Sequence, residues 1–424
     1  MMDRRQRDQY IEALGALQQL FRTLQWTAEE WREIQSILRT VDEACQKAFS
    51  PARGAYYHEI FDGLLQAGEQ AAANPVEDRG AVRQLSIEIL QLAVQALSTE
   101  TEIKKEVVFL PYKASMWDSL ESVWQAAAAD KAHCNTYVVP IPYADLNPDW
   151  SAREWHCEAE DFPSYVPVLD WRDFTLEKLR AMHPDIIFIH NPYDDCNYVT
   201  SVDAQYYSKN LKECTDELVY IPYFVMGEEL PETFCEMPGV FYADHVIVQS
   251  EAHKKQYEKH YFGIKAPEGK FLPLGSPKFD KVLSSRKQDF HLPKAWADRI
   301  KDRKVILYNT SLSTLLKYNQ DYLQKLEEVM HFFRGKSDVA LWWRPHPLME
   351  ASLTSMRPML YPAYEQIKNR YIEEAWGIYD DSPDLYRAIT YSDAYYGDWS
   401  SLVWLYQKTG KPILIQSIEG ETAE

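Results

Sequence analysis

The sequence has no Cys-x-x-Cys pair, no long apolar run and no signal-peptide core, and each absence excludes a class of protein. Its six cysteines are scattered along the chain, at positions 45, 134, 157, 196, 214 and 235. This spacing argues against a structural zinc site or a disulfide framework and favours a reducing compartment. No window approaches the length of a transmembrane helix. We therefore expect a cytoplasmic protein with no transmembrane segment. Peripheral contact with a membrane is compatible with this expectation.

Positive charge is also scarce. The 45 Lys and Arg residues face 64 Asp and Glu residues, which gives a formal net charge of −19. A protein that binds duplex nucleic acid needs a basic surface, so we expect no nucleic-acid partner. No Asp-x-Asp or paired His stands where a metal needs its ligands, and we expect neither a metal nor another cofactor. The absence of Gly-x-Gly-x-x-Gly argues against a dinucleotide dehydrogenase.

The 424 residues are enough for two or three domains, and the composition is that of a folded protein, with 46% hydrophobic and 26% charged residues. Residues 10–100 have apolar positions at helical spacing, such as Ile11, Leu14 and Leu17. Thr27 and Glu30 form a predicted capping box at the start of the second helix. We expect residues 1–103 to be an N-terminal all-helical region without chemistry of its own.

After residue 104 the pattern changes to short apolar runs that alternate with helices, which predicts parallel sheets covered on both faces. A charged stretch at residues 284–303 has no strand signal and divides the alternation into two halves. We therefore predict an α/β fold with two Rossmann-like domains facing a cleft, at residues 104–285 and 286–424. The expected strands lie at residues 107–110, 137–141, 186–189, 218–221, 245–248, 271–274, 305–308, 339–343, 377–379, 394–396 and 412–415.

Two segments of the second half place polar side chains directly after expected strands. Arg344 and His346 follow the first, while Asp398, Ser400 and Ser401 follow the second. A cation, an imidazole, hydroxyls and the free backbone N–H groups of a helix start are suited to a diphosphate. An ordinary helix cap is a slightly better explanation of the second segment when that segment is taken alone. Since strand ends at the mouth of an α/β sheet bind ligands, we favour a site in which His346 is catalytic.

A third segment follows the first strand of the second half. Asn309, Thr310 and Ser311 offer an amide and two hydroxyls that suit phosphate or ribose contacts. A cluster that only caps the next helix is an equally good interpretation. Both alternatives remain open from the sequence.

The second half resembles the CDP-glycerol glycerophosphotransferases, the family that builds teichoic acid on a GT-B fold. Its Arg-x-His-Pro segment corresponds to Arg344 and His346, followed by proline, and its Asp-Tyr-Ser-Ser turn corresponds to residues 398–401, where Trp399 replaces Tyr. The Gly-x-Pro-Lys-x-Asp element corresponds to residues 275–280 and the Lys-Pro-Ile strand to residues 411–413. The order and spacing agree over residues 245–416.

The first half departs from that family. At the place of the acceptor-side Trp-His-Gly-Thr segment, residues 220–225 contain no histidine. His190, at another strand end, is the nearest substitute for a catalytic base, although a buried structural histidine is the better interpretation of it. The chain also stops soon after the last expected strand, without the helices that return to the first half in this family. From this we expect a piece of a longer protein.

The resemblance implies a transferase that moves a polyol phosphate from a CDP-linked donor to a hydroxyl acceptor on a glycan or polymer end. Glycerol phosphate is the first candidate for the transferred group. Arg344, Asn309, Thr310, Ser311, Asp398, Ser400 and Ser401 would bind the nucleotide diphosphate, with His346 and His190 catalytic. A nucleotide-sugar glycosyltransferase or epimerase on the same fold is one alternative. A non-catalytic scaffold module that kept the fold is the other, because the acceptor motif is missing.

Overall fold

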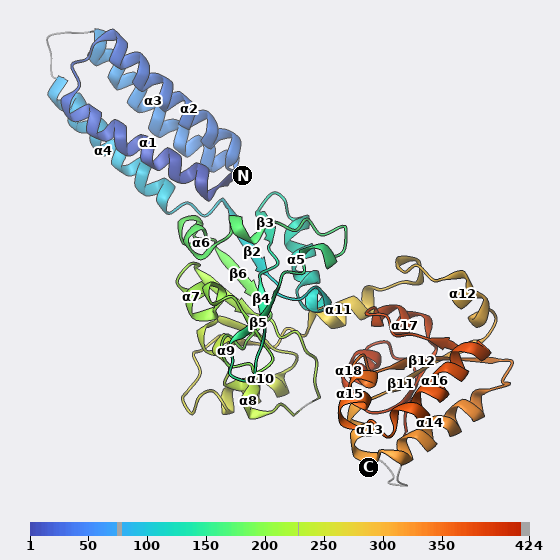
Figure 1. Cartoon of the computed structure of the whole chain (residues 1–424). Coiled ribbons are helices and arrows are strands. Elements are labelled where there is room, and N and C mark those ends of the chain that lie inside the picture. The colour runs from blue at the N-terminus through green and yellow to red at the C-terminus, as the bar shows by residue number, and fades with distance from the viewer. Residues whose placement is uncertain (74–78, 228, 417–424) are drawn as a thin grey trace. The chain divides into compact units, whose positions relative to one another are not determined.

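The structure is a computed structural model that describes residues 1–73, 79–227 and 229–416 (Figure 1). Its contacts divide the chain into two compact units. Unit 1 comprises residues 1–112, 123–189 and 197–219, and unit 2 comprises residues 113–122, 190–196 and 220–424. The range 104–285, expected as one domain, is therefore shared between the two units.

Four long helices form the N-terminal region, as the apolar periodicity predicts (Figure 1). Thr27 and Glu30 form the predicted capping box at the second of them, where the Thr27 N–H donates to Glu30 Oε2 over 3.0 Å and the Glu30 N–H donates to Thr27 Oγ1 over 3.2 Å. Their shared core includes the fully buried Phe21, Ile34 and Leu38. The helices are α1 (Arg4–Thr23), α2 (Ala28–Ala48), α3 (Pro51–Ala73) and α4 (Arg79–Ser98).

The first large sheet has seven strands in the order β1-β2-β6-β8-β9-β10, with β3 also paired to β2. Strand β2 pairs in parallel with β1, β3 and β6. The expected strands of this half are all present, most within two residues of the predicted bounds. They are β2 (Ile103–Leu110), β3 (Cys134–Val138), β6 (Ile186–Ile189), β8 (Glu217–Tyr220), β9 (His245–Ile247) and β10 (Phe271–Leu272). The short strand β1 (Met2–Asp3) is an addition, because the sequence predicts residues 1–103 to be all-helical.

Short helices connect the strands of this first half. They are η1 (Ala114–Ser119), α5 (Glu121–Ala129), α6 (Leu176–Met182), α7 (Ser208–Lys212), α8 (Glu232–Cys235), α9 (Pro238–Tyr242), α10 (Glu251–Lys259) and α11 (Pro277–Ser284). A small antiparallel sheet, in the order β5-β4-β7, is an addition that the sequence did not predict. Its strands are β4 (Tyr143–Leu146), β5 (Ala152–His156) and β7 (Thr200–Val202), whose polar residues hide the usual alternation.

The second large sheet is parallel throughout, in the order β13-β12-β11-β14-β15. Neighbouring residues of one strand enter different cores: Trp342 packs with α17 and α18, whereas Trp343 packs with α14, α15 and α16. Helices therefore cover both faces of the sheet, as a Rossmann-like fold requires. The strands are β11 (Lys304–Thr310), β12 (Val339–Pro345), β13 (Ile378–Tyr379), β14 (Ala394–Gly397) and β15 (Ile413–Ile415).

The helices of the second half differ from the prediction at one point. The helix expected from residue 318 to 333 is divided at Asn319, whose φ of 50° is left-handed and interrupts the regular helix. The helices are α12 (Lys294–Ile300), α13 (Leu312–Tyr318), α14 (Gln320–Phe333), α15 (Met349–Met356), α16 (Tyr361–Glu374), α17 (Leu385–Tyr391) and α18 (Ser401–Gln407). Two large sheets with connecting helices and an N-terminal helical region make this an α/β protein.

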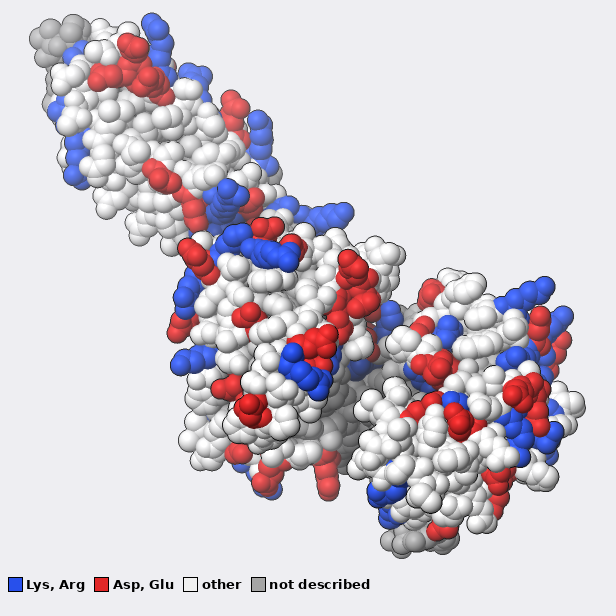
Figure 2. Space-filling view, in the orientation of Figure 1, with Lys and Arg blue, Asp and Glu red and all other residues white. Residues whose placement is uncertain are grey.

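The surface agrees with the acidic composition. On the face drawn in Figure 2, Lys and Arg side chains alternate with Asp and Glu side chains, and most of the area is uncharged. No continuous basic field covers the described residues on this face. Within the ranges described, none of the helices combines the length and the apolar character needed to cross a bilayer.

Candidate functional site

The register of the second sheet brings the three polar segments to one edge. The central strand β11 pairs Asn309 with Arg344 on one side and with Gly397 on the other. Beyond these pairs, the His346 N–H donates to the Thr310 carbonyl and the Asp398 N–H donates to the Asn309 carbonyl, both over 2.9 Å. Because the three strands are parallel, the segments that follow them meet at the carboxyl edge of the sheet.

The Ser400–Ser401 turn is tied directly to the end of β11. Asn309 donates from Nδ2 to the Ser400 hydroxyl over 3.1 Å. Ser400 is the N-cap of α18, which begins at Ser401, so the helix starts where the sequence predicts it. Ser400 is half-buried and Ser401 is exposed. The two hydroxyls therefore stand at the surface of this edge, where they are available to a ligand.

His346 is half-buried, and one of its nitrogens is already used. The Leu348 N–H donates to His346 Nδ1 over 3.1 Å. An accepting Nδ1 places the proton of the neutral ring on Nε2, which is then a hydrogen-bond donor. Burial lowers the pKa of His346 below its ordinary value, so the neutral ring is favoured at pH 7. The side chain is thus suited to donating to a phosphate oxygen.

Arg344 is placed at this edge but is engaged elsewhere. Its guanidinium lies 3.0 Å from Asp380 Oδ2 and donates to the Ser382 carbonyl over 2.5 Å. Asp380 is fully buried and also accepts from Trp342 Nε1 over 2.9 Å. The Arg344 guanidinium, which the sequence assigns to a diphosphate, is therefore paired with a carboxylate inside the protein. There it stabilises the end of β12.

Asp398, Ser311 and Thr310 are buried at the same edge. The Ser311 N–H donates to Asp398 Oδ2 over 2.6 Å, and Lys325 Nζ forms an ion pair with the other carboxylate oxygen. Ser311 caps α13, since its Oγ accepts from the Thr314 N–H over 3.2 Å. Thr310 Oγ1 accepts from Trp343 Nε1 over 3.2 Å. The geometry of these three residues follows the capping and structural alternative that the sequence left open.

His190, the second predicted catalytic histidine, has no exposed surface. Its Nδ1 lies 3.0 Å from the Ser119 hydroxyl, and burial lowers its pKa to about 3. The ring is therefore neutral across the physiological range. The structure favours the interpretation of His190 as a buried structural histidine.

Lys325 and Asp380 are the site residues that sequence reasoning missed. Lys325 lies on α14 among Tyr322, Leu323 and Leu326, on the face of the helix that enters the core. A lysine inside an apolar stripe is a signal for a buried partner, because an unpaired ammonium is costly to bury. Asp380 gives no comparable signal, since it follows a strand of only two residues and looks like a turn residue.

One group of potential metal ligands was also missed. Asp145, Glu154 and His156 present ligand atoms within 4.8 Å of one another on the β4–β5 hairpin. Cross-strand pairing, not sequence spacing, brings Asp145 opposite Glu154. Asp145 is already paired with Arg153 over 2.9 Å, and this group belongs to unit 1, whereas the polar edge of the second sheet belongs to unit 2.

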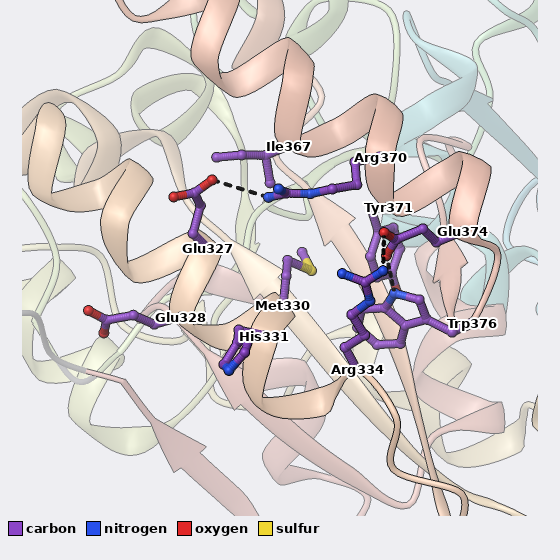
Figure 3. Close-up of a pocket in the computed structure, with 10 residues that line it drawn as sticks. All are labelled: Glu327, Glu328, Met330, His331, Arg334, Ile367, Arg370, Tyr371, Glu374 and Trp376. Carbon is purple, nitrogen blue, oxygen red and sulfur yellow. Dashed lines mark hydrogen bonds and ion pairs between the residues drawn. The ribbon is translucent and has the colours of Figure 1, made fainter.

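A charged cavity of about 340 Å³ lies between α14 and α16 (Figure 3). Arg370 pairs with Glu327 over 3.1 Å and Arg334 pairs with Glu374 over 2.6 Å, so both of its arginines have a carboxylate partner. The cavity lies beside the amino ends of the strands, since Arg334 precedes β12 and Trp376 precedes β13. None of the predicted site residues lines it. It is therefore separate from the candidate site.

A second cavity, of about 570 Å³, opens beside the Ser400–Ser401 turn. Its volume is within the range of small-ligand sites. All of the lining residues belong to unit 2, and they include both serines, Trp399, Trp404 and Gly227. The hydroxyls of the turn thus face a space that a ligand can occupy.

Comparison with known proteins finds a family match for the part of the chain that contains this edge of the sheet. Residues 239–422 match the family CDP-glycerol:poly(glycerophosphate) glycerophosphotransferase. The matched range contains every motif on which the predicted resemblance depends, and the resemblance is confirmed for this part of the chain. No curated protein sequence matches the chain.

The solved structures to which the chain is similar are distant in sequence. A putative UDP-N-acetylglucosamine 2-epimerase from Listeria monocytogenes is 13% identical, with 74% of this chain and 79% of that chain covered and a TM-score of 0.48. The UDP-GlcNAc 2-epimerase from Methanocaldococcus jannaschii is 10% identical, with 73% and 83% covered and a TM-score of 0.47. The wall teichoic acid polymerase TagF is 15% identical, with 73% and 68% covered and a TM-score of 0.41.

Proposed function

We propose that this protein transfers a polyol phosphate, with glycerol phosphate as the first candidate, from a CDP-alcohol to a hydroxyl on a glycan or polymer end. The observation that carries the proposal is the meeting of His346 and the Ser400–Ser401 turn at the end of β11. Both segments lie in the range that matches the glycerophosphotransferase family. The proposal therefore rests on a geometry and a family match that concern the same residues.

In this reaction the acceptor oxygen attacks the β-phosphorus of the donor. A new P–O bond forms, the bond from that phosphorus to the bridging oxygen breaks, and CMP leaves with the electron pair. The acceptor hydroxyl gives up its proton, which the phosphate oxygen of the departing CMP takes up directly or through water. The protein has little covalent chemistry to perform, so it acts by positioning the reactants and by donating hydrogen bonds to the oxygens that gain charge.

We assign the direct contacts to His346, Ser400 and Ser401. The His346 Nε2–H group would donate to a phosphate oxygen, since Nδ1 is occupied by the Leu348 N–H. The two serine hydroxyls would donate to the same diphosphate from the other side of β11. His190 receives no role in proton transfer, because it is buried and its pKa is lowered to about 3.

The other predicted residues would act through these three. Asn309 holds the Ser400 hydroxyl. Asp398 ties the end of β14 to Ser311 and Lys325. Arg344 fixes the end of β12 through Asp380, while its positive charge remains close to the edge. Pre-organisation of this kind lowers the cost of arranging donors during the reaction.

A ligand screen with a product assay tests the proposal. CMP, CDP and CDP-glycerol should raise the melting temperature, because a ligand at about 100 times its Kd adds roughly 2.7 kcal/mol of stability. UDP, GDP and UDP-sugars are the comparison set, and CMP release in the presence of a polyol or glycan acceptor is the activity measurement. Stabilisation by UDP-sugars alone would favour the glycosyltransferase or epimerase alternative. No stabilisation by any nucleotide would favour a scaffold module.

A further inference from the structure

Trp399 is more exposed than a tryptophan in the middle of a site usually is. It lies between Asp398, which is 1% exposed, and the half-buried Ser400, yet 51% of its own surface is accessible. Exposed indoles cost solvation free energy and are concentrated where a ring is presented to a partner. The glycerophosphotransferase pattern has a smaller tyrosine at this position, so this chain presents a larger ring there.

The Trp399 ring has an aromatic neighbour in the following helix. Trp399 meets Trp404 edge-to-face, with ring centroids 5.2 Å apart and an interplanar angle of 90°. Trp404 in turn packs against Gly227, where an added Cβ would lie 2.6 Å from its ring. No larger residue fits at Gly227 without moving the indole. The two tryptophans therefore form one aromatic wall of the cavity.

The same cavity joins this wall to the serine hydroxyls. Trp399, Trp404, Ser400 and Ser401 all line the space of about 570 Å³. Trp399 directly precedes the two serines in the chain, so the ring and the hydroxyls belong to one turn that lines the cavity. Among the described lining residues, Glu229 carries the only charge. The cavity thus combines a flat apolar surface, hydroxyl donors and a carboxylate acceptor.

We propose that the Trp399 indole stacks on the cytosine base of the donor nucleotide while Ser400 and Ser401 contact its diphosphate. This inference rests on the proposed function and names the part of the donor that the cavity selects. A glycerol chain has no flat face to stack, whereas a pyrimidine has two. Cytosine differs from uracil in its exocyclic amino group, a donor for which the Glu229 carboxylate is a suitable acceptor.

Calorimetric titration of CMP, CDP-glycerol and inorganic pyrophosphate into the full chain tests the inference. Base stacking on an aromatic side chain is worth roughly 5- to 100-fold in affinity. Trp399→Ala should weaken the binding of CMP by that factor and leave the affinity for pyrophosphate unchanged. Trp399→Tyr should bind CMP with a Kd within about threefold of the wild-type value, because it keeps an aromatic ring. Ser400→Ala should weaken both ligands. Trp150→Ala is the matched control, since Trp150 is 65% exposed but lies in unit 1.

The outcomes separate the inference from the proposed function. If the wild type binds CMP and Trp399→Ala binds it equally well, the stacking inference is wrong and the proposed function stands. If Trp399→Ala weakens CDP-glycerol but not CMP, the ring contacts the transferred group and the inference is again wrong. An equal loss of pyrophosphate binding would show a distorted turn and would also overturn it. If the wild type binds no cytidine nucleotide, both proposals fail together.

Discussion

Asn309 donates a hydrogen bond to the Ser400 hydroxyl over 3.1 Å, although 91 residues separate the two positions. The bond is made where β11 and β14 end, next to the backbone bond from the Asp398 N–H to the Asn309 carbonyl. The orientation of the Ser400 hydroxyl is thus set by the central strand of the sheet. Binding by the turn and the integrity of the strand end should therefore be coupled.

A double-mutant cycle measures this coupling. Asn309→Ala and Ser400→Ala should each weaken CDP binding. The Kd of the double variant should be only slightly higher than that of the single variant that binds CDP less tightly. Residues that share one hydrogen bond typically show an interaction energy of about 0.5–3 kcal/mol. Calorimetric Kd values for the four proteins supply the cycle. Losses that simply add would mean that Asn309 does not act through Ser400.

His346→Ala should reduce turnover by about 100-fold or more, because it removes a donor aimed at the reacting phosphate. Folding should be nearly unchanged, since the ring is half-buried and its only recorded side-chain bond is to the Leu348 N–H. The measurement is kcat for CMP release, with the melting temperature as the control for folding. A large loss of stability with little loss of kcat would contradict the assignment.

The pH dependence gives a separate check on His346. Burial lowers its pKa, so the ring is neutral above its ordinary titration range and keeps the Nε2 proton there. Between about pH 6.5 and 8, His346 should therefore cause no loss of activity, because its ring keeps the Nε2 proton throughout this interval. The kcat profile of the wild type should be compared with that of His346→Gln. A decline in this interval that His346→Gln abolishes would point to a charged imidazolium instead.

Lys325→Met should destabilise the protein by about 3–5 kcal/mol, because it leaves the buried Asp398 carboxylate without its cation. The Lys325→Met/Asp398→Asn double variant should recover part of that loss. Chemical unfolding gives the free energy of unfolding for each protein. Lys47→Ala is the control: its ion pair with Glu43 is exposed and its removal should leave the unfolding midpoint almost unchanged. Equal midpoints for Lys325→Met and the wild type would show that the pair is not stabilising.

His190 should make stability fall as the solution is acidified. Its folded-state pKa of about 3 lies below the unfolded value of about 6.5, so the unfolded chain binds the extra proton between these values. Stability from this group is present above pH 6.5 and is lost at up to about 1.4 kcal/mol per pH unit as the pH falls. His190→Gln should reduce the slope of unfolding free energy against pH. Identical slopes for the wild type and His190→Gln would contradict the burial argument.

The sequence predicted the parallel sheets and the edge where the polar segments meet, because apolar strands and the turns after them are local signals. It did not predict which polar groups would be free. Arg344 and Asp398 look alike as ligand candidates in the sequence, but their partners Asp380 and Lys325 come from distant elements. The antiparallel β4–β5 hairpin was missed for a similar reason, since it is defined by pairing across strands rather than by an apolar pattern.

The Lys325–Asp398 pair also has a consequence for the order in which this half of the protein assembles. The two residues are 73 positions apart, and α14 buries Lys325 on the face that packs against the sheet. Until Asp398 is in place, docking that helix would bury an ammonium without a counter-charge, which is strongly unfavourable. During synthesis, therefore, α14 should remain undocked while β12 and β13 are produced. The core between α14 and the second sheet should form in one late step, when β14 joins the sheet.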